Sequence, residues 1–169
     1  ISSWDVSNVT EYMDSMFRDA ISFNQDISSW DVSNVTRMQY MFYNATSFNQ
    51  DLTSWDVSNV EYMYNMFEGA IAFNNGGSGS INNWDIRKVI QIDQIFAGRE
   101  DGQGDFNQDI SGWDVSKITT WSRDNTNPGA MFPLSFNPNF APWYFQEEMS
   151  GYNEEKTAEG FTNRIKTDR

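Results

Sequence analysis

The sequence contains neither cysteine nor histidine, and each absence excludes whole classes of protein. Without cysteine, disulfides cannot hold the chain together, and without both residues the usual zinc ligand sets cannot be built. Without histidine there is no ordinary proton shuttle near neutral pH, and no Ser-His-Asp or Cys-His catalytic group. We therefore expect a protein that is not an enzyme and has no cofactor.

Basic residues are also scarce. The chain has 11 Lys and Arg against 24 Asp and Glu, which gives a net charge of −13. This surface repels phosphate backbones, so we expect no nucleic-acid partner. No run approaches the roughly 18 apolar residues of a membrane span, so we expect no direct membrane insertion by this segment. The 13 Phe and 7 Trp nevertheless indicate an ordered chain with a core to bury.

Three phrases recur in a fixed order along the chain. Trp-Asp-Val-Ser-Asn-Val stands at 4–9, 30–35 and 55–60, and in altered form at 84–89 and 113–118. Met-Phe follows at 16–17, 41–42, 66–67 and 131–132, with Ile95-Phe96 in the fourth unit. Phe-Asn comes last, at 23–24, 48–49, 73–74, 106–107 and 136–137. A period of about 25–30 residues indicates stacked repeat units. The chain starts within a unit, so we expect it to be a fragment of a longer array.

Apolar spacing within a unit predicts two kinds of element. Met38, Met41, Phe42 and Ala45 have the spacing of one face of a short helix. Residues 27–35 are rich in Ser, Trp and Val, as in a short strand with turns. Neither element is stable alone, but stacked units bury each other's apolar faces. The sequence therefore predicts an α/β repeat solenoid, right-handed and leucine-rich-repeat-like, with short parallel strands, short helices, about five repeats and a degenerate C-terminal cap.

This fold divides the chain into a solenoid at 1–145 and a polar C-terminal extension at 146–169. The extension is either a helix docked on the end or a loose tail. Within the solenoid we expect columns of Trp, Val, Met and Phe through one continuous core. A further column is expected to bond to the backbone of its own and neighbouring turns, a structural role: Asn24, Asn49, Asn74, Asn107 and Asn137.

The long phrase at 23–36, Phe-Asn-Gln-Asp-Ile-Ser-Ser-Trp-Asp-Val-Ser-Asn-Val-Thr, with a following Met-Phe, resembles the BspA-type surface-protein repeat. The same repeat occurs in mycoplasma surface lipoproteins and is grouped with leucine-rich-repeat-like proteins. The resemblance covers residues 1–120 well and 121–145 weakly. It implies a solenoid at the cell surface or secreted, acting in adhesion or protein binding, with no catalytic residues. The fourth and fifth units depart from it, with Arg87-Lys88 and Lys117 in the first phrase.

One column of carboxylates has two interpretations. In the first, each aspartate accepts backbone N–H bonds within its own turn, a common role for this residue. In the second, the column binds Ca²⁺, which prefers several oxygen ligands. A regular calcium loop is absent, so no metal or cofactor is otherwise expected. The aspartates are Asp5, Asp31, Asp56, Asp85 and Asp114.

Insertions mark a candidate binding face, since partners often dock on the loops of repeat proteins. The insertions lie at 75–80, 99–105 and 122–130. Basic residues also concentrate in this C-terminal half, and we expect the two features to share one edge. The alternative is neutral drift in exposed loops, with the basic residues neutralising nearby acids. The candidate residues are Arg87, Lys88, Arg99, Asp101, Lys117 and Arg123.

These observations predict a non-catalytic adhesion or binding module, extracellular or at the cell surface, whose partner is a protein or a glycan. The alternative is a structural subunit of a larger complex or filament, with self-association of the chain. Three Asn-x-Thr motifs, at Asn8, Asn34 and Asn44, match the N-glycosylation pattern, although two follow from the repeat itself.

Overall fold

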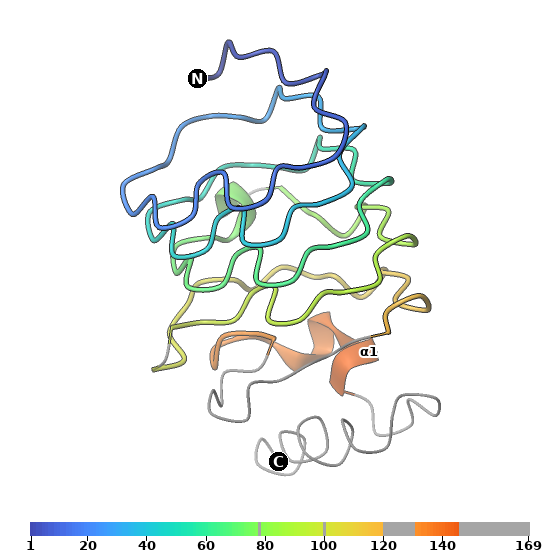
Figure 1. Ribbon diagram of the computed structural model, residues 1–169. Helices are drawn as coiled ribbons and strands as arrows, with labels where there is room; N and C mark the ends of the chain where they lie inside the picture. Colours follow the sequence, from blue (N-terminus) through green and yellow to red (C-terminus); the bar gives the residue numbers. More distant parts are fainter. Residues whose placement is uncertain (78, 100, 120–130, 146–169) are drawn as a thin grey trace.

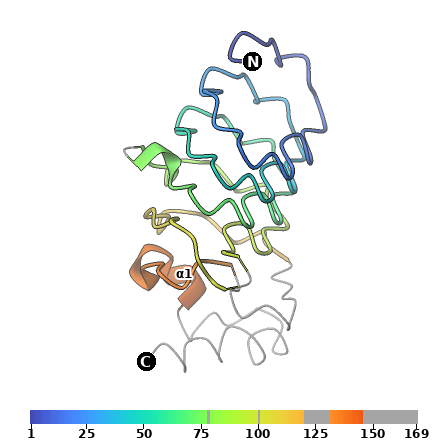
Figure 2. The same ribbon diagram turned by 90° about the vertical axis from the view of Figure 1, so that its left-hand side faces the viewer.

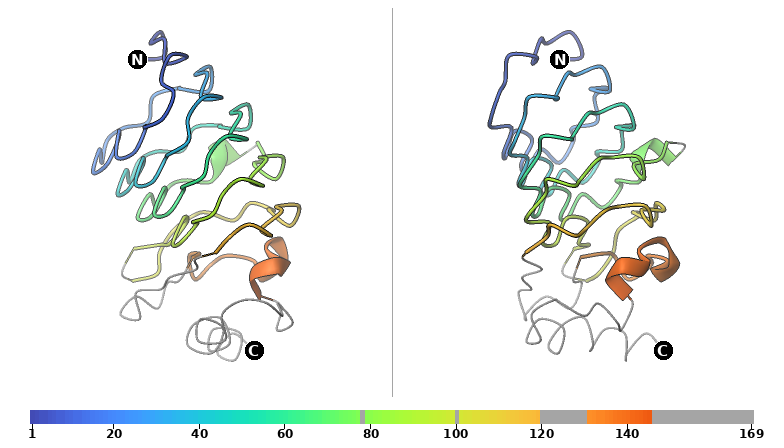
Figure 3. Two further views of the ribbon diagram at one scale, coloured as in Figure 1. Left: turned by 45° about the vertical axis from the view of Figure 1, so that its right-hand side comes forward. Right: turned by 90° about the vertical axis from the view of Figure 1, so that its right-hand side faces the viewer.

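The computed structural model describes residues 1–77, 79–99, 101–119 and 131–145. The chain passes through a series of flat coils, one for each repeat unit, with its N-terminus and helix α1 (Pro142–Phe145) at opposite ends of the stack (Figure 1). Two further views show the coils lying over one another in the same orientation (Figure 3).

Regular secondary structure is sparse in the described part of the chain. The helices are η1 (Asn75–Gly77), η2 (Pro138–Phe140) and α1 (Pro142–Phe145). Of these, η1 stands out from the side of the stack (Figure 2), and η2 and α1 lie at its C-terminal end. Strand pairing within the described residues is limited to three isolated parallel bridges, Tyr12 to Arg37, Arg37 to Tyr62 and Tyr62 to Gln91.

The predicted α/β repeat solenoid of leucine-rich-repeat type is therefore wrong. Residues 38–45 form turns and no helix, and residues 27–35 form turns and no strand. The described residues contain no sheet built from one strand per unit. The units consist instead of consecutive tight turns.

Left-handed residues explain why the Met-Phe segment cannot be helical. Tyr40 has φ 58° and Asn44 has φ 54°, and both interrupt the run of right-handed residues that a helix needs. The Met41 N–H bonds to the Met38 carbonyl and the Ala45 N–H to the Phe42 carbonyl, as in β-turns. These turns have the same apolar spacing as one face of a helix, and this is why the pattern predicted a helix here. The left-handed positions recur as Ser15, Tyr40, Asn65 and Gln94, and as Asp19, Asn44 and Gly69.

Residues 27–35 fold as two turns for a related reason. The Trp30 N–H bonds to the Ile27 carbonyl at 3.1 Å, and the Val35 N–H to the Val32 carbonyl at 2.9 Å. Asp31 accepts the Ser33 N–H, which fixes the turn between the two valines. Alternation of buried and exposed side chains therefore arises from turn geometry without an extended strand.

The predicted core columns are confirmed from the second unit onward. Trp30, Trp55, Trp84 and Trp113 are each about 4% exposed or less, and Met41, Met66 and Phe42 are buried. Within each unit two Phe rings stack with centroids 3.6–4.1 Å apart. Rings of neighbouring units follow at 5.2–6.2 Å. The core is thus one continuous aromatic column.

The predicted asparagine column is confirmed as a structural ladder. In the first four members the Oδ1 accepts the backbone N–H of the equivalent asparagine in the next unit, at 2.8–3.0 Å, and in the fifth, Asn137, it accepts the Asn139 N–H at 3.0 Å. Tryptophans form a second ladder, since the Trp55 Nε1–H donates to the Ile27 carbonyl and the Trp84 Nε1–H to the Leu52 carbonyl. Both ladders connect adjacent units along the stack.

The two ends of the stack differ. At the N-terminal end Trp4 is 56% exposed and Met16 is 40% exposed. At the C-terminal end α1 packs on the last coil, where Tyr144 is 3% exposed and its ring lies 5.1 Å from that of Phe132. The predictions for 146–169 fall outside the described residues, as do those for 120–130.

Candidate binding surface

The aspartate column is engaged within its own turns. In each member Oδ1 accepts the backbone N–H two residues later, at 3.0–3.2 Å. Asp5 and Asp31 also accept the hydroxyls of Ser7 and Ser33 at 2.6 Å. These bonds lower the pKa of Asp5 and Asp31, and those from Arg87 lower the pKa of Asp85 to about 2. The geometry is that of the turn-forming interpretation.

Calcium would need several converging oxygens. Within residues 1–77, 79–99, 101–119 and 131–145, no three acidic side chains are arranged to hold a metal ion. Asp56 has the same turn bond to Ser58 as the other members. The donor set of the column, one carboxylate from each turn, does not fit the cation.

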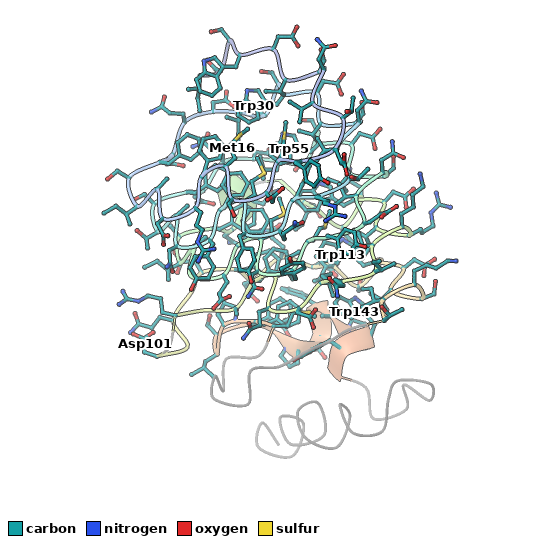
Figure 4. The ribbon with its side chains drawn as sticks, viewed as in Figure 1. Met16, Trp30, Trp55, Asp101, Trp113 and Trp143 are labelled. Atoms are coloured by element: carbon teal, nitrogen blue, oxygen red, sulfur yellow. The ribbon has the colours of Figure 1, made fainter. Side chains whose placement is uncertain are left out.

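The predicted basic face is divided between separate edges of the molecule. Arg87 forms two bonds to Asp85, at 2.8 and 2.6 Å, and the Lys88 Nζ donates to Asn59 Oδ1 at 2.6 Å. These residues and Lys117 belong to the turns that follow the tryptophans. Asp101 lies at the opposite edge from Trp113 (Figure 4). Arg123 lies outside the described residues, and Arg99 belongs to the loop of Asp101.

Both described insertions fold back on the stack. In the first, buried Asn75 accepts the Leu52 N–H at 2.8 Å and donates to Thr53 Oγ1. In the second, the Gly102 N–H bonds to the Arg99 carbonyl at 2.7 Å, and the Gly102 carbonyl accepts the Leu134 N–H. The insertions therefore have structural contacts of their own.

The structure reveals a different surface, formed by the Met-Phe segments of the first three units. We call it the tyrosine face. Arg37 lies over the rings of Tyr12 and Tyr62, with its Cζ 5.2 and 4.8 Å from their centroids. The tyrosine face comprises Tyr12, Arg18, Arg37, Tyr40, Tyr43, Tyr62 and Tyr64.

Ring contacts form a second group within the tyrosine face, beside that of Arg37. Tyr40 and Tyr64 meet edge to face with centroids 5.3 Å apart. Arg18 then lies over Tyr40 at 5.0 Å and over Tyr43 at 4.8 Å. Such contacts between a guanidinium and an aromatic ring hold both groups in place at about 0.5–1 kcal/mol each at exposed sites. The face is thus preorganised across three units.

Nearby acidic residues and burial raise the pKa of three hydroxyls of the tyrosine face, those of Tyr12, Tyr43 and Tyr64. A hydrogen bond from Tyr12 to Glu11 raises the pKa of the phenol. Burial, and after it the charge of Glu68, raises the pKa of Tyr43. Burial also raises the pKa of Tyr64. Tyr12, Tyr43 and Tyr64 are therefore uncharged hydrogen-bonding groups, and acidic side chains lie near Tyr12 and Tyr43.

Tyr40 has a conformation that disfavours tyrosine. Its φ of 58° lies in the left-handed region, which costs a bulky residue of order 1–2 kcal/mol. Equivalent positions in other units carry Ser15, Asn65 and Gln94, of which asparagine tolerates this region best. A strained tyrosine on a surface is a pointer to function.

Sequence reasoning missed this face because the tyrosines were treated as part of the repeat background. Five of the chain's seven tyrosines lie between positions 12 and 64, and this bias was the available signal. It was not decisive, since the predicted helix would have dispersed these residues around its axis.

One hollow among the described residues is small. A hollow beside the loop 99–105, lined by Phe73, Phe96, Phe106 and Pro133 among others, has a volume of about 10 Å³. This holds at most about one water molecule. Among the residues described, no helix is long and apolar enough to cross a bilayer.

Sequence comparison places the chain near one family of proteins. The model of a family described as "Mycoplasma protein of unknown function, DUF285" matches residues 1–80 and again residues 77–167. No curated protein and no solved structure matches the chain. Two successive matches agree with the internal repetition.

Proposed function

The chain belongs to the Mycoplasma protein family DUF285, and we propose that it is a non-catalytic protein-binding module exposed at the cell surface or secreted. The tyrosine face supports this proposal. Tyr and Arg are enriched at the energetic centres of protein interfaces, where both present large contact areas and hydrogen-bonding groups. The location is inferred from the resemblance of the phrase at 23–36 to BspA-type surface repeats.

A protein partner fits the face better than a glycan or a nucleic acid. The surface is broad and aromatic, with two guanidinium groups already fixed on tyrosine rings. Its border carries Glu11, Asp14, Asp19 and Glu68, whose charges act on the tyrosines. Such a border favours a partner with Lys or Arg around an apolar centre, and repels acidic surfaces.

A non-catalytic role is supported by the chemistry available. The aspartates of the column are engaged in turns, and the hollow beside loop 99–105 is too small for a substrate. Neither feature provides a pair of carboxylates across a cleft, which hydrolysis of a glycosidic bond would need.

The test uses substitutions that the repeat itself permits. Tyr40→Asn, Tyr62→Gln and Tyr64→Gln introduce residues found at the equivalent positions Asn65, Gln91 and Gln39. The fold is therefore retained, and Tyr40→Asn removes backbone strain. The probe is an array of short peptides that combine aromatic residues with lysine or arginine, compared with matched acidic peptides. The intact chain should select basic aromatic peptides, and the triple variant should lose at least about tenfold in affinity.

A matched control addresses the competing surface. Lys88→Ala with Lys117→Ala removes basic residues outside the tyrosine face and should leave peptide affinity unchanged. If this pair abolishes binding while the tyrosine variant binds normally, the function belongs to the turns after the tryptophans. If the intact chain selects acidic peptides, the proposed partner chemistry is wrong.

An assembly role is the second candidate, and one observation favours it. The N-terminal end of the stack exposes Trp4 and Met16, whose counterparts in the second unit, Trp30 and Met41, are buried. This end is large, apolar and regular, as an interface between stacked units would be.

A further inference from the structure

Three rings of the tyrosine face meet at steep angles beside a cation. Tyr40 meets Tyr43 at 68° with centroids 5.8 Å apart, and it meets Tyr64 at 88° with centroids 5.3 Å apart. The Arg18 Cζ lies 5.0 Å from the Tyr40 centroid and 4.8 Å from the Tyr43 centroid. We call Tyr40 and Tyr43 the aromatic corner, which Tyr64 supports from behind Tyr40. Since ring faces attract cations, the corner is a cation site that a side chain of the same chain occupies.

A carboxylate is held beside the aromatic corner. Asp19 Oδ2 lies 3.5 Å from Arg18 Nε, and Asp19 Oδ1 accepts the Asn44 Nδ2–H at 3.0 Å. Burial, and after it the charges of Glu68 and Asp19, raise the pKa of Tyr43, so both carboxylates act on this ring. Two ring faces and a positioned carboxylate are together suited to bind a guanidinium group.

The two arginines of the tyrosine face are held differently. Arg37 lies between Tyr12 of one neighbouring unit and Tyr62 of the other, and it forms backbone bridges with both residues. Arg18 contacts rings of one unit only, its side chain is 46% exposed, and its ion pair with Asp19 is exposed as well. Contacts of this exposed kind are individually weak. Arg18 can therefore leave the corner without any change in the stack.

Resting on the proposed function, we infer that the partner places an arginine side chain in the aromatic corner, where it replaces Arg18. The incoming guanidinium lies over Tyr40 and Tyr43 and pairs with Asp19. Arg18 is then an internal competitor, which lowers the apparent affinity by the fraction of the time that it occupies the corner. This assigns to one position of the tyrosine face both a ligand group and a device that limits its affinity.

Other groups match the corner less well than arginine. A guanidinium is planar, stacks on aromatic faces and is more weakly hydrated than an ammonium group, so lysine gains less from the same rings. An acidic side chain would meet Asp19 and Glu68, whose charges act on Tyr43, and would be repelled. The corner therefore distinguishes arginine from lysine, which the broader preference for basic partners does not.

The experiment removes the internal competitor from the full chain. Arg18→Ala introduces the residue that the fourth unit has at this position, Ala97, so the fold is retained. Calorimetric titration uses three end-blocked tripeptides that differ only at the centre: Trp-Arg-Trp, Trp-Lys-Trp and Trp-citrulline-Trp. Arg18→Ala should bind the arginine peptide about five- to tenfold more tightly than the intact chain does. The gain should be smaller for lysine and absent for citrulline, which has the shape of arginine without its charge.

A second variant controls for the lost positive charge. Arg18→Ala combined with Tyr43→Gln has the same net charge as Arg18→Ala alone, and glutamine is close in shape to Glu68, the counterpart of Tyr43 in the third unit. The double variant should bind the arginine peptide no better than the intact chain. Equal gains in both variants would show that charge alone raises the affinity, and the inference would be wrong.

Nuclear magnetic resonance follows Arg18 itself in the intact chain. The rings of Tyr40 and Tyr43 should shift the Arg18 Nε–H proton signal upfield, and the spectrum of Arg18→Ala identifies this signal by its absence. Saturating arginine peptide should return the signal toward the position of a hydrated arginine, whereas the citrulline peptide should leave it in place. A signal that stays upfield at saturation would show that Arg18 keeps its place, which contradicts the exchange.

The results separate this inference from the proposed function. If the triple tyrosine variant loses peptide affinity, while Arg18→Ala binds the arginine peptide no better than the intact chain or more weakly, the proposed function stands and the inference is wrong. In that case Arg18 is itself part of the binding surface. If neither the intact chain nor Arg18→Ala binds any of the three tripeptides, the inference and the proposed partner chemistry are both wrong.

Discussion

The two ends of the stack differ in how much of their apolar surface is covered. At the C-terminal end the last coil is covered, since Ala141 and Tyr144 are buried and the Trp143 Nε1–H donates to the Ile110 carbonyl at 2.9 Å. At the N-terminal end Trp4, Met16 and Ile21 face solvent. The covering helices begin with prolines, Pro138 in η2 and Pro142 in α1. A proline suits the first residues of a helix, because the N–H that it lacks would have no partner within the helix there.

This difference shows that the repeat phrases alone do not decide burial. Trp4 and Trp55 stand in identical phrases, Trp-Asp-Val-Ser-Asn-Val, yet one is 56% and the other 3% exposed. Position in the stack decides which copy belongs to the core, as expected when each unit contacts only its neighbours.

The largest expected effect therefore compares Trp55→Ala with Trp4→Ala. Removal of the buried ring should lower the free energy of unfolding by about 3–5 kcal/mol. The same change at Trp4 should cost less than about 1 kcal/mol, because most of that ring is already hydrated. Urea denaturation followed by circular dichroism measures both. Equal losses would show that Trp4 is covered in solution.

Sequence alone predicted the packing of this molecule better than its secondary structure. The Trp, Met and Phe columns and the asparagine ladder followed from phrases that recur in register. The α/β assignment failed at residues 38–45, because successive β-turns produce the same apolar spacing as a helix. The cost of left-handed Tyr40 and Asn44 is offset by hydrogen bonds to the next unit, which the pattern within one unit cannot reveal.

The binding surface was harder to predict for the same reason. Arg37 meets Tyr12 and Tyr62 only because residues 25 positions apart align between units. The turn-forming role of the aspartates, in contrast, could be given as one of two alternatives. Asp5 accepts the N–H of Ser7, two positions on, and such a local bond can be expected from the sequence of one turn.

The covered end offers the second prediction. Tyr144→Ala removes a buried ring from Phe132 and should lower stability by about 2–4 kcal/mol. Ile21→Ser, at the open end, should change stability by less than about 0.5 kcal/mol, since this side chain is 61% exposed. Thermal unfolding of the two variants checks this. A Tyr144 variant as stable as the original chain would mean that α1 does not act as a cap.

A smaller effect tests where the open end is incomplete. Asn24→Ala should cost about 1 kcal/mol, much the same as Asn74→Ala. Both Oδ1 atoms accept from the next unit, from the Asn49 N–H and the Asn107 N–H respectively. The position of Asn24 in the first unit should therefore make no difference. A negligible loss for Asn24 alone would show that the ladder frays at this end, which amide hydrogen exchange of Asn49 would detect directly.

The smallest expected effect is a pH dependence common to both ends. Hydrogen bonds from Ser7 and Ser116 lower the pKa of Asp5 in the first unit and Asp114 in the fifth, and bonds from Arg87 lower that of Asp85 to about 2. A carboxyl group with a lowered pKa stabilises the folded chain above its ordinary pKa of 3.8, and this contribution is lost as the pH falls through the folded value.

For Asp85 the loss should run from about pH 4 down to about pH 2. Asp85→Ala should therefore lower the thermal midpoint at pH 7 by at most about 2 °C, since the pair with Arg87 is exposed, and by less at pH 2. Asp5→Ala and Asp114→Ala should also lower the thermal midpoint more at pH 7 than at pH 2. The two positions should agree although they lie toward opposite ends, because each hydrogen bond is confined to one turn. Melting curves at pH 7, 4 and 2 decide the point. A greater effect at pH 2 than at pH 7 would contradict the turn-forming role, and a loss restricted to Asp5 would show that the open end also weakens local turns.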